Sequence, residues 1–360
     1  MPRKPIAVVV DVTIVSHEFP RSNYGPDFAS PKAGAHWRTM CDEDDERSKR
    51  YDSLSYSALK ELALNPNSGV HMRKAIDYFD YDHTGRGSQP WWSTVVDNFH
   101  TVHDSADFPI GYSYTTPVIT PEIYLWFLLT EFRRLGGRTL CQQVSHVLDA
   151  IQWIAMKHRP VTVVINCTGH GARHLGGVND HRCYQTRGQT ILVRAAWVEE
   201  TITWLSKTGE AMYIIPRANG EVILGGTKES YINDDKPRGT TTTHILSTIL
   251  KRYPNILPPG STEKYAKNPD LMSKFDIVDM RVGFRPSRIG GIRIDVEQSR
   301  TGYDEPILIA HNYGHGGAGY QSSWGCAQEV FEKISAARKE PSWTSTTTTV
   351  DADPSSKARL

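Results

Sequence analysis

The chain has 360 residues, and its 41 basic and 40 acidic side chains leave a formal net charge of +1. A charge this close to zero provides no basic surface of the kind that contacts phosphates, so we expect no nucleic-acid partner. Aromatic residues make up 10% of the sequence, which excludes a disordered chain, and the length accommodates two folded domains.

The cysteines and the apolar segments exclude further classes of protein. The five cysteines are odd in number and contain no Cys-x-x-Cys pair, so we expect neither a disulfide framework nor a metal site, and we infer a reducing compartment such as the cytoplasm. No apolar run reaches the roughly 18 residues that a membrane-spanning helix needs. The apolar run at the start of the chain is similar to a signal peptide, but Asp11 breaks it and no small-residue cleavage site follows.

Two apolar runs rich in β-branched residues open the chain, at residues 6–10 and 12–15. Such runs are typical of strands that are buried on both faces of a parallel sheet. Residues 16–50 are rich in turn-forming and then in charged residues, and residues 53–79 have a helical pattern in part. We therefore predict that the chain begins with a parallel α/β unit.

A helix is predicted to begin after Thr120, which suits the N-cap position. Pro121 fits the first helical turn because its missing N–H is not needed there, and Glu122 adds a favourable negative charge. The helix is predicted to end at Gly136 and Gly137, because glycine terminates helices.

The second half of the chain changes character. Residues 161–166 form another apolar run of the buried-strand type, whereas residues 184–228 contain short strand patterns separated by polar turns, which is typical of an antiparallel sheet. A helix is predicted near residues 240–252, strands over residues 275–295, and a final helix over residues 324–338.

These elements predict an α/β fold with two interleaved domains. The first is a Rossmann-like dinucleotide-binding domain made by residues 1–183 and 284–338. The second is a mostly antiparallel substrate domain made by residues 184–283. Residues 339–360 are rich in Pro, Ser and Thr, and we expect them to form a disordered tail.

A glycine-rich segment, HNYGHGGAGYQSSWG at residues 311–325, is the strongest candidate for a binding site. Its five glycines let the backbone approach a ligand closely, and the helix predicted to follow offers free N–H groups to an anion. The alternative is a flexible surface loop. The large side chains between the glycines, including Tyr313, Tyr320 and Trp324, argue against that alternative.

Two further residues are candidates for substrate binding. Arg285 stands between apolar residues in the segment GFRPSR, where a guanidinium needs an anionic partner such as a carboxylate. A structural ion pair is the alternative. Tyr213 opens the apolar segment YIIPR, where its ring could line a pocket with the hydroxyl inward, or belong to the core.

Eight segments together resemble the D-amino-acid oxidases, especially those of fungi, in the order of that family and from about residue 11 to residue 338. The resemblance predicts the fold given above. These segments are ASPKAGAHW (29–37), YTTPVI (114–119), VINCTG (164–169), RGQT (187–190), YIIPR (213–217), GGT (225–227), GFRPSR (283–288) and HNYGHGGAGYQSSWG (311–325).

The resemblance implies noncovalently bound FAD as the cofactor and a D-amino acid and O₂ as the small-molecule substrates. In this family a hydride passes from the α-carbon of the D-amino acid to the flavin. The imino acid hydrolyses to a 2-oxo acid and ammonia, and O₂ reoxidises the flavin to give hydrogen peroxide. The cofactor carries the difficult chemistry while the protein orients the substrate.

The resemblance also assigns roles to residues. It implies that Arg285 and Tyr213 bind the substrate carboxylate, that the Gly317 carbonyl meets the substrate amine, and that Gln321 reaches the substrate or its water. The positions that match cofactor contacts are Ser30, Gly34, Ala35, Val144, Gly169, Gly316, Gly317, Gly319, Tyr320 and Gln321.

Lys228 departs from the usual family pattern. Many members have an aromatic residue directly after the segment GGT, over the active site, whereas the D-aspartate branch often has a cationic residue there. Lys228 therefore favours acidic substrates. The alternative is that Lys228 faces solvent and that Tyr231 takes the aromatic role.

The glycine loop that binds the FAD pyrophosphate is absent. Proteins of this type begin with a strand, a GxGxxG turn and a helix. In this chain the run that ends at Val10 is followed directly by the run that begins at Asp11, and no glycine precedes Gly25. The first βα unit is therefore incomplete, by about 20 residues from the usual size of such a unit. We expect weak FAD binding or none.

The C-terminal tripeptide Ala358-Arg359-Leu360 resembles a peroxisomal address, which implies the peroxisomal import receptor as a partner. The resemblance also makes a homodimer a fair expectation. Two alternatives stay open for the activity: a glycine or sarcosine oxidase-like enzyme, and an inactive isoform that no longer binds FAD.

Overall fold

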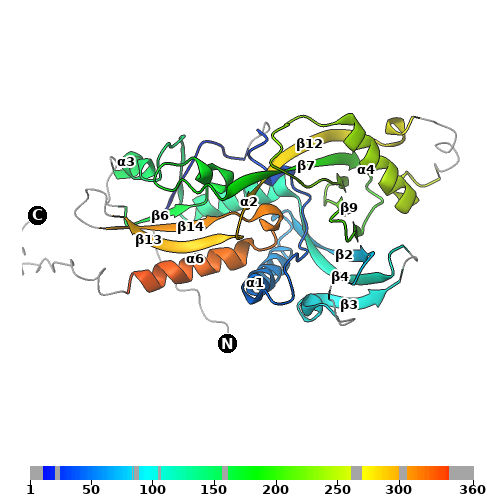
Figure 1. Ribbon diagram of the computed structural model, residues 1–360, viewed down its shortest axis with the longest axis horizontal. Coiled ribbons are helices and arrows are strands. Elements are labelled where there is room, and N and C mark those ends of the chain that lie inside the picture. Colours follow the sequence, from blue (N-terminus) through cyan, green and yellow to red (C-terminus); the bar gives the residue numbers. More distant parts are fainter. Residues whose placement is uncertain are drawn as a thin grey trace, which may run out of the picture.

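The structure is a computed structural model that describes residues 11–20, 25–82, 84, 89–103, 107–155, 161–260, 270–299 and 306–339. The strand expected at residues 6–10 and nearly all of the expected tail lie outside the described residues. One large sheet and its covering helix form one end of the molecule, and a smaller three-stranded mixed sheet with its helices forms the other (Figure 1).

The large sheet has nine strands in the order β11-β7-β10-β9-β8-β2-β4-β3, with β12 paired to β7. Neighbouring strands are antiparallel except β2 and β8, which pair in parallel. The sheet thus extends beyond the predicted substrate domain, since it takes in strands from residues 70–119. The strands are β2 (Val70–Phe79), β3 (Asp97–Val102), β4 (Ile110–Ile119), β7 (Cys183–Arg194), β8 (Thr201–Leu205), β9 (Ala211–Pro216), β10 (Glu221–Gly225), β11 (Glu229–Ser230) and β12 (Ile277–Arg288).

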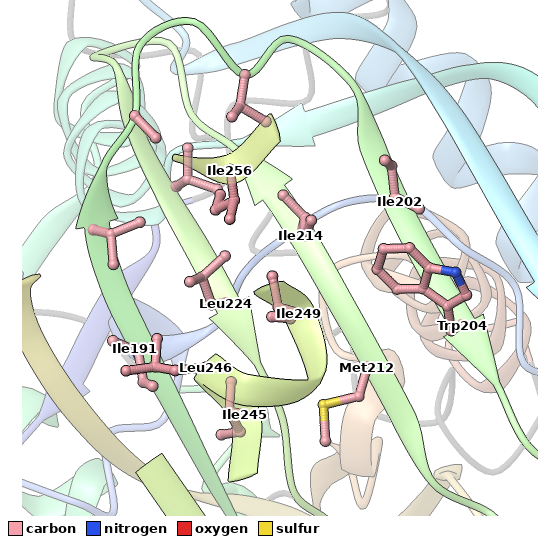
Figure 2. Packing of buried hydrophobic residues seen from close by; sticks show 14 of the residues in the cluster. Ile191, Ile202, Trp204, Met212, Ile214, Leu224, Ile245, Leu246, Ile249 and Ile256 are labelled. Atoms are coloured by element: carbon pink, nitrogen blue, oxygen red, sulfur yellow. The ribbon is translucent and has the colours of Figure 1, made fainter. Parts of the chain in front are cut away.

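One face of this sheet is covered by α4 (Gly239–Arg252). Because side chains alternate along a strand, Ile191 of β7, Ile214 of β9 and Leu224 of β10 point to the same side and pack with Ile245 of α4, all fully buried (Figure 2). The residues that lie between these along each strand therefore point to the opposite face.

The second region is the smaller sheet, in which β14 (Ile307–Tyr313) lies between β13 (Arg293–Ser299) and β6 (Val163–Asn166). Two helices pack beside it, α1 (Glu46–Leu62) and α6 (Ser323–Ala337). Gly325 allows their close approach, because a Cβ atom at this position would lie 2.3 Å from the Tyr51 Cα.

The remaining parallel strands form a separate two-stranded sheet of β1 (Thr13–Ser16) and β5 (Arg138–Cys141). The strand predicted at residues 12–15 is thereby confirmed. Among the described residues β1 pairs only with β5, and β6 only with β14, so each has one unpaired edge. Ile14 and Ile165, on these two strands, are 38% and 50% exposed, which is unusual for strands of a parallel α/β sheet.

The predicted helices are found with shifted boundaries. The helix expected within residues 53–79 is α1, and the strand β2 occupies residues 70–79. The helix predicted after Thr120 is α2 (Pro121–Arg134), but the Thr120 hydroxyl is buried and makes no hydrogen bond, so it does not cap the helix. A short helix, α3 (Asp149–Ala155), was not predicted. None of the helices in the described ranges is long and apolar enough to cross a membrane.

Candidate functional site

Three glycines, on β7, at the end of β10 and directly after it, make a flat area on the sheet face opposite α4. A Cβ atom on Gly188 would lie 2.5 Å from Nη1 of Arg285, and a Cβ on Gly225 would lie 2.3 Å from the ring of Tyr213. A Cβ on Gly226 would lie 2.4 Å from the Tyr213 hydroxyl. The two candidate substrate-binding side chains therefore lie directly on the backbone, and no larger residue fits beneath them.

Arg285 is a partly buried guanidinium without a carboxylate partner among the described residues. Its Nη1 donates to the carbonyl of Thr227 at 2.9 Å, and its other N–H groups make no hydrogen bond within the described part of the chain. Its neighbours Arg281, Arg187 and Arg217 all form ion pairs. No structural ion pair of Arg285 is therefore found in the described ranges, and free donors remain for an anion.

Tyr213 is close to Arg285 along the sheet. Its hydroxyl lies against Gly226, and Arg285 binds the carbonyl of the next residue, Thr227. The ring packs against the buried side chains Ile215 and Ile223. The hydroxyl has no hydrogen-bond partner in the ranges that the structure describes. Tyr213 is thus fixed by apolar contacts, with its hydroxyl free to donate.

The glycine-rich segment reaches the same site. A Cβ on Gly317 would lie 3.1 Å from Cε of Met40 and 3.9 Å from Cδ of Arg285, so this glycine lies beside the arginine stem. Gly316 lies against Ser287, with 3.3 Å between its added Cβ and the Ser287 hydroxyl. The backbone of His315 forms an isolated antiparallel β-bridge with Ser287.

Burial lowers the pKa of His315 to about 4, so its imidazole is neutral at pH 7 and adds no charge next to the candidate site. On the other side of β12, a Cβ on Gly169 would lie 3.3 Å from Pro286. Gly169, Gly316 and Gly317, three of the positions predicted to bind the cofactor, therefore meet at residues 285–287.

A turn at residues 30–35 forms another wall of the site. The Tyr320 hydroxyl donates to the Ser30 carbonyl at 3.0 Å, which ties the turn to the glycine-rich segment. Gly34 packs on β9, where its added Cβ would lie 2.4 Å from Cδ1 of Ile215. Ala35 is buried and is joined to Gly34 by a cis peptide bond. Ser30, Gly34, Ala35 and Tyr320 are thus brought together.

Two residues that hold this turn were not predicted from the sequence. Arg217 donates from Nε to the Gly34 carbonyl at 3.1 Å and from Nη2 to the Ala33 carbonyl at 3.0 Å. Its charge is balanced by Glu122 of α2, 3.2 Å away. The signal was an arginine placed directly after the apolar run of YIIPR, where burial requires a partner.

The side chain of Gln321 hydrogen-bonds to Asp52 and not to Arg285. It is buried, and its Nε2 donates to a carboxylate oxygen of Asp52 at 3.0 Å, while the Ser322 hydroxyl donates to the other oxygen at 2.6 Å. Burial raises the pKa of Asp52, although these hydrogen bonds oppose the effect. The signal that could have found Asp52 is its place on the buried face of α1, beside Tyr51 and Ser55.

The remaining residues that the sequence proposed for the site are Val144, Gly319, Lys228 and Tyr231. Val144 belongs to a small apolar cluster with Val147 beside β6 and β14, and Gly319 has no atom within 4 Å of an added Cβ. Lys228 is exposed. Tyr231 is 64% exposed and stacks on Tyr184, with 4.6 Å between the ring centroids. No group of His, Cys, Asp and Glu in the described ranges could hold a metal ion.

The chain is similar to known proteins over most of its length. A family model described as "DAO: FAD dependent oxidoreductase" matches residues 29–333. A D-aspartate oxidase of Cryptococcus neoformans var. grubii is 33% identical, over 89% of this chain and 88% of its own length. A D-amino-acid oxidase of Schizosaccharomyces pombe is 31% identical, over 84% of this chain and 82% of its own.

Solved structures share the fold. A glycine oxidase from Geobacillus kaustophilus superposes with a TM-score of 0.65 at 14% identity, covering 91% of this chain and 88% of its own. An L-proline dehydrogenase from P. horikoshii superposes with a TM-score of 0.66 at 13% identity, covering 91% and 87%. At such identities the likeness establishes the arrangement of an α/β part and a second large sheet, and no specific activity.

Proposed function

The chain belongs to the family of FAD-dependent oxidoreductases whose model its residues 29–333 match, and from that membership we propose that it oxidises D-amino acids to imino acids. The fungal D-aspartate and D-amino-acid oxidases similar to it over most of their length support this substrate class. Water then converts the imino acid to a 2-oxo acid and ammonia. Bound FAD supplies the hydride acceptor, and O₂ returns it to the oxidised form while hydrogen peroxide is released.

Arg285 is the observation on which the proposal rests. A guanidinium that is partly buried, unpaired within the described residues and laid on the glycine backbone is suited to bind a carboxylate in the bidentate manner. The Tyr213 hydroxyl, free at the neighbouring position, donates to the same carboxylate. Together they fix the carboxylate end of the substrate.

We propose that the described residues hold the flavin-ring end of FAD. Gly316, Gly317 and Gly34 present bare backbone at this place, and each packs so closely on a neighbouring side chain that a larger residue would press on it. The ring end would thus be held between the turn at residues 30–35 and the segment at residues 314–320.

The pyrophosphate end fits poorly. In the common doubly wound order, the first strand lies between the second and fourth strands and carries the glycine turn. Among the described residues β1 and β6 belong to two separate sheets that no strand joins, and the sequence has no glycine before Gly25. The exposed side chains of Ile14 and Ile165 are consistent with a sheet that lacks this βα unit.

Peroxide release tests the proposed function. The purified chain, supplied with excess FAD, is expected to release peroxide from D-aspartate or D-alanine and to leave the L enantiomers unchanged. Turnover of both enantiomers at equal rates, or of glycine and sarcosine in preference to every D-amino acid, would contradict the proposal.

We also propose that Lys228 favours acidic substrates. It follows Thr227, whose carbonyl binds Arg285, and its ammonium has no carboxylate partner among the described residues. A second substrate carboxylate would therefore meet a free cation near the one that binds the first. The D-aspartate oxidases among the similar proteins support this preference.

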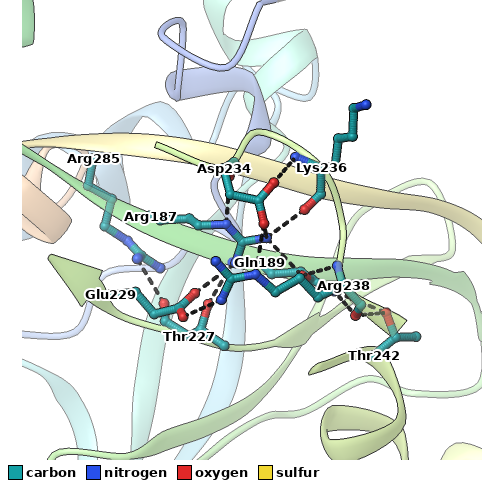
Figure 3. Close-up of polar contacts among 9 residues, drawn as sticks. All are labelled: Arg187, Gln189, Thr227, Glu229, Asp234, Lys236, Arg238, Thr242 and Arg285. Atoms are coloured by element: carbon teal, nitrogen blue, oxygen red, sulfur yellow. Dashed lines mark hydrogen bonds and ion pairs between the residues drawn. The ribbon is translucent and has the colours of Figure 1, made fainter. Parts of the chain in front are cut away.

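Replacing Lys228 with alanine is expected to lower the ratio of kcat/KM for D-aspartate to kcat/KM for D-alanine about fivefold, because a partly solvated ion pair contributes roughly 1 kcal/mol. Lys236→Ala is the matched control, since Lys236 lies in the same segment and its side chain points away from the other labelled groups in Figure 3. An unchanged ratio in Lys228→Ala would mean that Lys228 faces solvent and does not select the substrate.

We propose further that the chain is imported into peroxisomes through Ala358-Arg359-Leu360, residues that lie outside the described ranges. Peroxide production suits a compartment that contains the product. A fluorescent protein fused to the N-terminus of the full chain is expected to collect in peroxisomes, and to become diffuse when the three residues are deleted. The same distribution with and without them would contradict the proposal.

A further inference from the structure

Arg187 of β7 is a completely buried guanidinium on the α4 face of the large sheet, and its partners hold one segment of chain (Figure 3). Nε donates to the Asp234 carbonyl, Nη2 to the Lys236 carbonyl and Nη1 to a Glu229 carboxylate oxygen, each at 2.7 Å. Nη2 also donates to Oε1 of Gln189 at 3.2 Å. Three of the four bonds therefore end on residues 229–236.

Further polar contacts, made by Arg238 and Gln189, hold the same segment. Arg238 donates from Nη1 to the other oxygen of Glu229 at 2.7 Å and from Nε to Asp234 at 2.8 Å. Gln189 accepts from the Arg238 backbone N–H at 2.8 Å and donates to the Arg238 carbonyl at 3.1 Å. Two arginines and two carboxylates thus form a balanced set that anchors both ends of the segment to β7.

This set is linked to the candidate substrate site through Thr227. The Gln189 backbone N–H donates to the Thr227 hydroxyl at 2.9 Å, and the Thr227 carbonyl accepts from Arg285 at 2.9 Å. Arg187 and Gln189 are the chain neighbours of Gly188, and Arg285 lies on the Gly188 backbone on the opposite face of the sheet. Gly188 therefore contacts Arg285 on one face of the sheet, while its two chain neighbours make the anchoring contacts on the other face.

The other contacts of the segment are a short strand pairing of β11 with β7, a hydrogen bond from the Tyr231 backbone N–H to the Gln185 carbonyl at 3.0 Å, and the stacking of Tyr231 on Tyr184. Few of its side chains are buried, because Lys228 and residues 231–233 are exposed. A segment with few buried apolar contacts moves readily unless polar contacts hold it. The planar guanidinium of Arg187 satisfies two carbonyls and a carboxylate at fixed angles, which a lysine ammonium does not reproduce.

We propose that Arg187 is a positioning residue for substrate binding: it fixes residues 227–238, and thereby the Thr227 carbonyl that orients Arg285 and the Lys228 side chain beside it. This inference rests on the proposed function for the identity of the ligand, but its structural half, the anchoring of the segment, does not depend on any activity.

Proteolysis of the full chain tests the anchoring. Chymotrypsin cleavage after Tyr231, followed by mass spectrometry, is expected to be at least tenfold faster in Arg187→Met than in the unchanged chain. Arg288→Met is the matched control, because Arg288 is a buried arginine of the adjacent strand β12 whose bonds go to Asp180 and the Gly291 carbonyl. In this control the rate at Tyr231 is expected to stay within twofold.

A second variant keeps the test decisive if Arg187→Met unfolds. Arg238→Gln removes a partly exposed member of the set, and cleavage after Tyr231 is expected to rise severalfold without faster cleavage elsewhere. Cleavage at Tyr231 that is unchanged in Arg238→Gln, and in any Arg187→Met that folds, overturns the inference.

The kinetic readout separates positioning from a general structural role. In an active preparation, Arg187→Lys is expected to raise KM for the D-amino acid about tenfold while kcat changes less than threefold, since Arg285 would bind less well but the bound substrate would react as before. A fall in kcat as large as the rise in KM, or no change in either constant, overturns the positioning role. If no D-amino acid is oxidised by the unchanged chain, the proposed function fails while proteolysis still decides whether Arg187 anchors the segment.

Discussion

Replacing Arg285 with methionine is expected to lower kcat/KM for D-amino acids about 10³-fold, the largest effect of any single substitution in the site. Removing one partner of a desolvated, bidentate charge pair costs roughly 4 kcal/mol, which corresponds to this factor. The loss is expected mainly in KM, because the carboxylate is bound in the ground state and in the transition state alike. Initial rates of peroxide release with excess FAD measure it.

Two further variants make this result specific. Arg285→Lys retains the charge but not the planar pair of donors, and is expected to recover part of the loss, to about 10²-fold below the unchanged chain. Arg194→Met, at an exposed arginine of β7 that pairs with Asp276, is expected to behave as the unchanged chain. Full activity in Arg285→Met would mean that the substrate carboxylate binds elsewhere.

The chain is expected to bind FAD about 10³-fold more weakly than a variant that receives a GxGxxG turn and a helix between Val10 and Asp11. The inserted turn would place backbone N–H groups and a helix N-terminus at the pyrophosphate. Two or three charge-assisted hydrogen bonds, each worth roughly 1.5–3 kcal/mol, account for this difference. Titration of FAD followed by its fluorescence measures both affinities.

An insertion of the same length made of glycine and serine is the control for this experiment. It lengthens the connection but supplies no helix N-terminus, and is expected to leave FAD affinity as low as before. Equal and tight binding by the unchanged chain would show that β1 and β6 do not need an intervening βα unit to hold the cofactor. Failure of the inserted variant to bind FAD would place the defect elsewhere in the site.

Local sequence patterns predicted the parts of the fold that depend on neighbouring residues. The helix α2 is marked by Pro121 at its start and Gly136 at its end, and β1 by its run of β-branched residues. The glycines at 188, 225 and 317 could be associated with Tyr213 and Arg285 only through the resemblance to a family, because their distances along the chain say nothing about contact.

The features that the sequence did not predict depend on contacts between distant segments of the chain. The strands β2, β3 and β4 joined the large sheet through the pairing of β2 with β8, more than 120 residues later. Asp52 meets Gln321, and Arg187 meets Asp234 and Lys236, through side chains whose burial is decided by the packing of whole elements. From the sequence alone, polar residues of this kind are predicted to face solvent, because a buried polar group needs a partner that the sequence does not identify.

The visible spectrum of the FAD-saturated chain, recorded without oxygen during addition of D-aspartate and then of L-aspartate to a second sample, tests the central claim most directly. The claim is that Arg285 and Tyr213 present a D-amino acid to the flavin. We expect the oxidised-flavin absorbance to bleach with the D enantiomer, to persist with the L enantiomer, and to persist with both in Arg285→Met. Bound flavin that no D-amino acid bleaches would contradict the account.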